Sequence, residues 1–139
     1  MVRFRSPATG AALVLGAAVV AIGLRRSVVR VHGLSMRPTL RDGDLVLTLP
    51  LPTVRDDGAS QGLAWRLRAW LVRPGALLVV SEPADRGHLI IKRATRVSAD
   101  GVHIVGDDPG WSIDSRTFGP VPHRDVRRVA LARLPLPRR

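Results

Sequence analysis

Lys92 and Ser35 are the two residues of this sequence whose types and surroundings could together support catalysis. Lys92 is the only lysine, although lysine and arginine together number 22. It lies in an apolar run, residues 89–93, whose pattern predicts a strand. A lysine among apolar groups can lose its proton, whereas an arginine stays charged, so Lys92 could act as a general base. The best candidate for the group that it would deprotonate is Ser35, within residues 31–40.

Each of these residues also has an ordinary structural interpretation. A serine close to a proline-containing turn often makes only local hydrogen bonds, and a lone lysine on a strand usually points to solvent. Alternation along the strand, however, puts Lys92 on the same face as Ile90, so both face the core if Ile90 does. Two familiar serine-enzyme patterns do not fit, because G-x-S-x-G would need glycine at Arg37 and S-x-x-K would need serine at Leu89. If Ser35 is a nucleophile, Lys92 is therefore the favoured base.

A polar segment near the end of a later predicted strand is a third candidate for chemistry. Residues 106–116 concentrate hydroxyl and acidic side chains, and residues 117–121 continue the segment. Composition predicts a long loop there. Because catalytic side chains are often carried on loops held by a rigid sheet, we expect this segment to contribute to the site.

The overall composition narrows the possible classes of protein. A length of 139 residues fits one domain, and the absence of cysteine excludes disulfides and thiolate chemistry. The histidines lack metal-site spacing, so neither a metal nor a cofactor is expected; they are His32, His88, His103 and His123. The net charge of +11 suits an anionic partner, either nucleic acid or a lipid surface. With three tryptophans and two phenylalanines there is little to stack on bases, so no nucleic-acid partner is expected.

The N-terminal segment is uncharged and apolar from residue 8 to residue 24, with arginines on both sides. As a helix it would span about 25 Å, near the short end of what crosses a bilayer. It predicts a tail and single transmembrane anchor within residues 1–26. A cleaved secretory signal, with small residues at Ala21 and Gly23, and a buried core helix are the alternatives.

The remaining sequence has the periodicity of short strands separated by glycine and proline turns. Strands are predicted at residues 45–49, 76–80, 89–93, 102–105 and 126–131. They favour a small sandwich or barrel-like sheet, in a domain that covers residues 27–133 and is followed by a disordered tail, 134–139.

An insertion at residues 50–75 interrupts this pattern. Within it, residues 63–72 include Trp65 and Trp70 next to arginines and could form a short helix. Tryptophan and arginine together suit a membrane–water interface, so an interfacial helix is one interpretation. The other is an insertion whose tryptophans pack on the sheet.

Four segments in this order resemble the sequence boxes of type I signal peptidases, the serine–lysine leader peptidases. They are residues 33–40, 43–46, 92–93 and 106–121, and the resemblance extends from the N-terminal segment to Arg128. Each box alone is a weak signal, whereas four in order behind one apolar segment are specific. The resemblance implies a mainly β fold, with one N-terminal transmembrane helix followed by a small signal-peptidase/LexA-like β-sheet domain.

The resemblance also implies a mechanism for the two residues singled out first. Ser35 would attack the scissile carbonyl and form an acyl-enzyme, and its backbone amide would donate to the oxyanion. Lys92, neutral in its apolar setting, would take the serine proton and later activate the deacylating water.

Supporting roles are implied for residues of the last box and for two neighbours of the serine. Ser112 would hydrogen-bond the Lys92 amine, while Asp114 and Arg116 would form a supporting ion pair. Gly106, without a side chain, would leave room for Lys92. Two further residues would pack beside the dyad and the substrate pocket: Met36 and Pro38.

The implied function is that of a membrane-anchored serine endopeptidase that removes signal or leader peptides from exported proteins. Its catalytic domain would lie on the extracytoplasmic side of the cell membrane, with the lipid bilayer and precursor signal peptides as partners. The sequence departs from the family pattern at Gly33, which offers no hydroxyl, at Asp108, where asparagine is usual, and at Arg128, which replaces a glycine.

Three other functions remain open from the sequence. The small size also suits a maturation protease dedicated to one or few precursors. A LexA-like self-cleaving protein shares the serine and lysine boxes, but would need a DNA-binding domain where this chain has its apolar segment. A non-enzymatic, basic, membrane-attached binding protein would not need Ser35 or Lys92.

Overall fold

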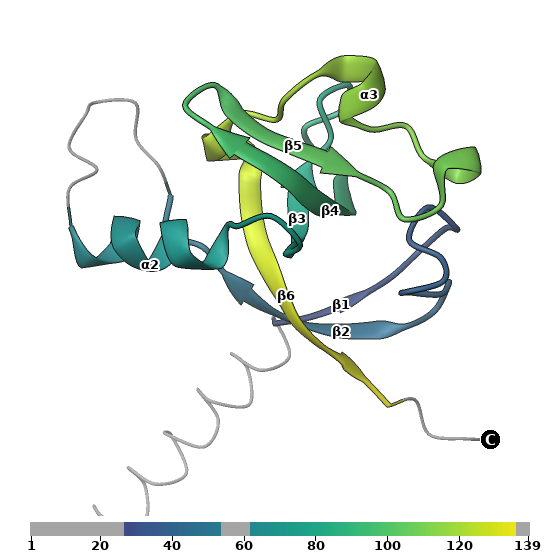
Figure 1. Cartoon of the computed structure of the whole chain (residues 1–139). Coiled ribbons are helices and arrows are strands. Elements are labelled where there is room, and N and C mark those ends of the chain that lie inside the picture. The colour runs from purple at the N-terminus through teal and green to yellow at the C-terminus, as the bar shows by residue number, and fades with distance from the viewer. Residues whose placement is uncertain (1–26, 54–61, 136–139) are drawn as a thin grey trace, which may run out of the picture.

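The described part of the chain is built around one antiparallel sheet. The computed structural model describes residues 27–53 and 62–135. Six strands lie in the order β1-β2-β6-β3-β4-β5 (Figure 1). Their bounds are β1 (Val28–Arg30), β2 (Leu45–Pro50), β3 (Leu77–Ser81), β4 (Leu89–Ser98), β5 (Gly101–Val105) and β6 (Val126–Leu134). The short helices between them are α2 (Leu63–Leu71), η1 (Pro109–Trp111), α3 (Ser115–Phe118) and η2 (His123–Asp125).

The sheet has two parts that share β6. This strand pairs with β2 along most of its length, but with β3 only between Val126 and Val129. Figure 1 shows β1 and β2 crossing the lower part of the long curved β6, and β3, β4 and β5 beside its upper part. Each part has its own apolar core. The larger core includes Leu78, Val80, Ala94, Val102, Ile104, Val121 and Val129, and the smaller one is Val31, Met36, Leu40 and Val46.

The predicted fold class needs correction on two points. The sheet is open, because β1 and β5 form its two edges and do not pair, so the expected sandwich or barrel is wrong. The fold class also included a transmembrane helix, yet no helix within residues 27–53 and 62–135 is long and apolar enough to cross a membrane. The nine residues of α2, for example, extend only about 14 Å along a helix axis. The stretch predicted as an anchor, 1–26, lies outside the described residues.

The predicted strands are all present, with shifted ends. The strand of Lys92 continues to Ser98, and the last strand continues to Leu134. The strand β1 was not predicted, because its three residues are too few to show alternation. The segment predicted as one long loop after β5 contains η1 and α3, each too short for a periodic signal.

The helix α2 is attached to the sheet by an arginine. Arg68 is buried and donates hydrogen bonds to the backbone carbonyls of Pro52, at 2.9 Å, and Val126, at 3.0 Å, and to that of His123. The ring of Trp65 meets the ring of His123 edge-on, with 6.2 Å between centroids. The possible helix of the insertion is therefore present, and it is held by the hydrogen bonds of Arg68 and by Leu71, which packs against the larger core.

Candidate active site

Ser35 lies in a tight turn between β1 and β2. Gly33 allows the turn, since its φ of +91° is a conformation that residues with side chains rarely adopt. The Gly33 amide donates to the Asp42 carboxylate at 2.8 Å. Met36, directly after the serine, and Leu40, at the end of the turn segment, are buried in the smaller core. The turn is thus fixed on both sides of Ser35 by packing and hydrogen bonds.

Lys92 reaches Ser35 from the opposite part of the sheet. On β4 it pairs with the fully buried Leu78 of β3, and its own side chain is only 5% exposed. The Lys92 Nζ atom lies 2.7 Å from Ser35 Oγ, although the two residues are 57 positions apart in the sequence. The structure therefore brings together a buried amine and a hydroxyl at hydrogen-bond distance, which is the geometry a base needs to take a proton from a nucleophile.

Burial determines the protonation of this amine. Desolvation lowers the pKa of Lys92 from the ordinary lysine value, because the charged form loses its water shell. The negative charges of Asp114 and Glu82 raise the pKa, and the positive charge of Arg116 lowers it, but desolvation is the largest effect. A larger fraction of Lys92 is therefore neutral near physiological pH than for a solvated lysine.

Any reaction that uses Lys92 as a base should become faster as pH rises. The protonated amine is inactive, so the acidic limb of the pH–rate profile should have an apparent pKa below 10.5, the ordinary lysine value. Glu82→Gln removes a charge that raises the pKa of Lys92, so it should move this limb to lower pH. Measuring kcat/KM for a peptide substrate across pH would check both statements. A limb that does not move in Glu82→Gln would contradict this electrostatic assignment.

Ser112, Asp114 and Arg116 form a connected group beneath the dyad. The Ser112 hydroxyl donates to Asp114 Oδ2 at 2.6 Å, and the guanidinium of Arg116 donates to both Asp114 oxygens at 2.9 and 2.6 Å. Burial raises the pKa of Asp114, but these hydrogen bonds, with one from the Gly106 amide, outweigh it and hold the pKa well below the usual range. The carboxylate is therefore ionised at physiological pH.

This arrangement differs from the expected roles in two respects. The ion pair of Asp114 and Arg116 is present, but the hydrogen bond of Ser112 goes to Asp114 instead of the Lys92 amine. Gly106 does leave room, but the atoms nearest to a Cβ at this position would belong to Ser112 and Ser35. A Cβ there would lie 2.3 Å from Ser112 Oγ and 2.6 Å from the Ser35 carbonyl oxygen.

A second polar cluster, not predicted from the sequence, ties three segments of the site together. Arg93, next to Lys92 on β4, forms a two-pronged ion pair with Asp107, with both N–O distances 2.7 Å. Thr39, from the serine turn, donates to Asp107 at 2.5 Å. The same arginine donates to the carbonyl of Gly75 at 2.9 Å. These contacts fix the serine turn, the lysine strand and the polar segment relative to one another.

Loss of the Asp107 charge should loosen this cluster. Asp107→Asn keeps the size of the side chain but leaves Arg93 without its ion pair, so we expect unfolding free energy to fall by about 1–2 kcal/mol. Because the dyad spans the tied segments, peptide cleavage should fall by about tenfold. Urea unfolding and kcat/KM would measure the two effects. Asp100→Asn, at the exposed β4–β5 hairpin, is the matched control and should change neither.

A cleft of about 340 Å³ opens beside the dyad. Its lining includes Ser35 and Lys92 together with residues 29–33, 79 and 88–91. Two strand edges border it. Among the described residues, β1 pairs only with β2, and β4 pairs with β5 only from Arg93 onward, so residues 89–92 have one backbone edge open there. An extended peptide could hydrogen-bond to either edge and bring its carbonyl to Ser35.

A hydrogen-bond donor for a developing oxyanion is also available. Within residues 27–53 and 62–135 the amide of Ser35 has no acceptor, whereas its carbonyl accepts from the Asp108 amide at 2.9 Å. The bond to Asp108 holds the peptide group in place. The Ser35 amide can therefore stabilise negative charge on a carbonyl attacked by its own hydroxyl.

No family model, curated protein or solved structure matches this chain. The chemistry of the site consequently rests on its own geometry. The geometry shows that Ser35 and Lys92 meet at one cleft, and that residues 106–116 are joined to the serine turn by the hydrogen bond from the Asp108 amide to the Ser35 carbonyl.

The remaining candidate residues lie away from the cleft or in the core. Met36 is buried in the smaller core, and Pro38 is exposed, lining a separate hollow with Arg37 and Arg41. Neither is among the residues that line the cleft beside Ser35. In the described ranges, no three histidine, aspartate or glutamate side chains are grouped so that they could hold a metal ion.

Proposed function

We propose that this protein is a serine endopeptidase that cuts signal or leader peptides from exported proteins through a Ser35–Lys92 dyad. The observation that carries the proposal is the 2.7 Å separation of Lys92 Nζ and Ser35 Oγ, with a 5% exposed lysine, at a cleft bordered by open strand edges. A solvated structural lysine would need none of these features. A non-enzymatic binding protein would have no reason to bury an amine against a hydroxyl.

The first half of the reaction forms an acyl-enzyme. Neutral Lys92 takes the proton of Ser35 as Oγ attacks the scissile carbonyl, and the Ser35 amide stabilises the oxyanion. The resulting ammonium gives its proton to the leaving amine as the carbon–nitrogen bond breaks. The N-terminal part of the substrate is then held as an ester on Ser35, and Lys92 is neutral again.

The second half hydrolyses this ester. Lys92 removes a proton from a water molecule, which attacks the ester carbonyl, and then returns the proton to Ser35 Oγ as the acid product leaves. One amine thus serves as base and acid in both halves. The charge of Asp114, fixed by Ser112 and Arg116, partly stabilises the ammonium that forms in each half.

The lining of the cleft supports apolar substrate side chains. Valine and isoleucine residues dominate its apolar lining, among them Val29, Val31 and Ile90. A volume of about 340 Å³ accommodates several side chains of an extended peptide. Signal peptides have small residues just before the cut and are cut on the extracytoplasmic side of the membrane, so that location is part of the proposal.

The direct test is cleavage of a signal-bearing precursor by the full-length protein. We expect a single new N-terminus after small residues, identified by mass spectrometry, and an acylated Ser35 peptide when the reaction is quenched early. Ser35→Ala should abolish both products, and the matched variant Ser98→Ala, on the distant end of β4, should retain them. Equal product from wild type and Ser35→Ala would refute the proposal.

A further inference from the structure

The helix α2 has the reverse of the usual polarity of a surface helix. An ordinary surface helix packs its apolar face on the core and shows its charged face to water. In α2 the buried residue is Arg68, which is 2% exposed. Three of its apolar residues face outward instead, with Leu63 83%, Leu67 47% and Trp70 63% exposed, whereas Leu71 at the helix end is partly buried against the larger core.

The contacts of Arg68 fix this orientation. Its guanidinium satisfies three backbone carbonyls, those of Pro52, His123 and Val126. Burial of an arginine is costly, so its inward position is maintained by these bonds. Turning Leu63, Leu67 and Trp70 inward would move Arg68 away from the three carbonyls and break its hydrogen bonds to them. The outward apolar face is therefore a built-in feature of the fold.

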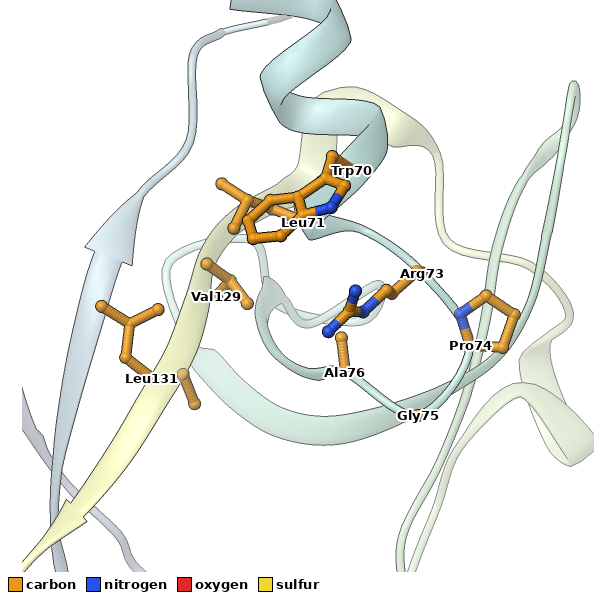
Figure 2. A pocket seen from close by; sticks show the side chains of 9 residues that line it. Trp70, Leu71, Arg73, Pro74, Gly75, Ala76, Val129 and Leu131 are labelled. Carbon is orange, nitrogen blue, oxygen red and sulfur yellow. The ribbon is translucent and has the colours of Figure 1, made fainter.

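The apolar face of α2 continues onto the sheet across a hollow of about 460 Å³. Figure 2 shows Trp70 and Leu71 of the helix on one side of this hollow, Val129 and Leu131 of β6 on another, and Arg73 on a third. Leu131 is 53% exposed and lies beyond Val129, where pairing with β3 has ended. The exposed apolar surface thus combines α2 with one end of β6.

The charged residues in the segment that forms this face are all arginines. Between Asp57 and Glu82 the chain has no acidic residue, whereas Arg66 and Arg73 are exposed beside the tryptophans. The Arg73 guanidinium lies 5.3 Å from the ring centroid of Trp70. Leucine, tryptophan and arginine on one face, without acids, is the composition of helices that lie in the headgroup region of anionic membranes.

We infer that the outer face of α2, together with Leu131, docks on an anionic lipid surface. The helix lies parallel to the surface, with Leu63, Leu67 and Trp70 at the boundary with the acyl chains and the arginines among the phosphates. This binding site lies apart from the dyad and requires no catalysis. It therefore stands or fails separately from the proposed peptidase function.

Single-tryptophan variants of the full chain would locate the contact. Trp65→Phe with Trp111→Phe leaves Trp70, and Trp65→Phe with Trp70→Phe leaves Trp111. Trp111 is the matched control because it is 68% exposed and belongs to η1, the coil after β5, which Figure 1 shows on the opposite side from α2. Each variant is mixed with vesicles of equimolar phosphatidylglycerol and phosphatidylcholine that contain brominated acyl chains, and circular dichroism checks that both are folded.

The inference predicts several-fold stronger bromine quenching of Trp70 than of Trp111. Arg66→Glu should weaken the quenching of Trp70, as should added salt or vesicles of phosphatidylcholine alone. Equal quenching of the two tryptophans would overturn the inference. So would a Trp70 already shielded from acrylamide without lipid, because that result would place a second protein copy on the face.

Discussion

Replacing Lys92 with arginine is expected to lower kcat/KM for peptide cleavage by about 10⁴-fold or more, as when a member of a catalytic triad is removed. The guanidinium keeps its proton at any pH at which the protein is folded, so it cannot accept one from Ser35. A larger charged group in a 5% exposed position could also disturb packing. Lys92→Met, which keeps the length of the side chain and removes the amine, should be equally inactive and should fold.

The control for these variants separates loss of the base from loss of a basic residue. Arg96→Lys changes an exposed basic residue on the same strand and should leave cleavage unchanged. Thermal unfolding of all three variants would show whether the fold is intact. Retained cleavage by folded Lys92→Met would mean that another group deprotonates the serine, and the dyad mechanism would be wrong.

Gly106→Ala is expected to reduce cleavage by about 10²-fold, although it adds only one methyl group. The added Cβ would lie 2.3 Å from Ser112 Oγ, 2.5 Å from Ser112 Cβ and 2.6 Å from the carbonyl oxygen of Ser35. Two of these three atoms belong to a side chain that is held by Asp114, and the third belongs to the nucleophile's own backbone. The serine turn must therefore shift, and with it the 2.7 Å contact with Lys92.

Gly110→Ala is the matched control for this substitution. Its nearest neighbour would be Asp108 Oδ1 at 3.5 Å, an ordinary contact, and its backbone needs no unusual φ. We expect wild-type cleavage from it. If Gly106→Ala instead cleaves normally and unfolds at the wild-type temperature, close packing at this glycine has no part in positioning the serine.

The sequence was informative where one residue type was exceptional. A single lysine among arginines, on an apolar strand, was enough to pair Lys92 with Ser35, and the strand boundaries followed from glycine and proline turns. The partners of Ser112 and Gly106 could not be predicted in this way. Their contacts depend on the path of residues 106–114, where a displacement of a few ångströms exchanges Lys92 for Asp114 as neighbour.

Two other features could not be predicted from the sequence. Arg93 and Asp107 lie in two of the segments that resemble the family's sequence boxes. An ion pair between two segments cannot be assigned from one sequence without the register of β4 and β5. Arg68 lies between two tryptophans in the sequence, which suggests an arginine that faces solvent. Its burial is stabilised by hydrogen bonds to backbone carbonyls that are distant in the sequence. Tertiary contacts reversed the local preference.

The position of β6 has a consequence for when the proposed dyad can assemble. It is the last strand along the chain, yet it lies in the middle of the sheet and is the link between β2 and β3. During synthesis, Ser35 and Lys92 are both added to the chain well before β6. The two parts of the sheet that position them are joined only when β6 has been made. Newly synthesised molecules should accordingly stay catalytically silent until synthesis has passed Leu134, and clipping within this strand should switch off mature ones in a single event.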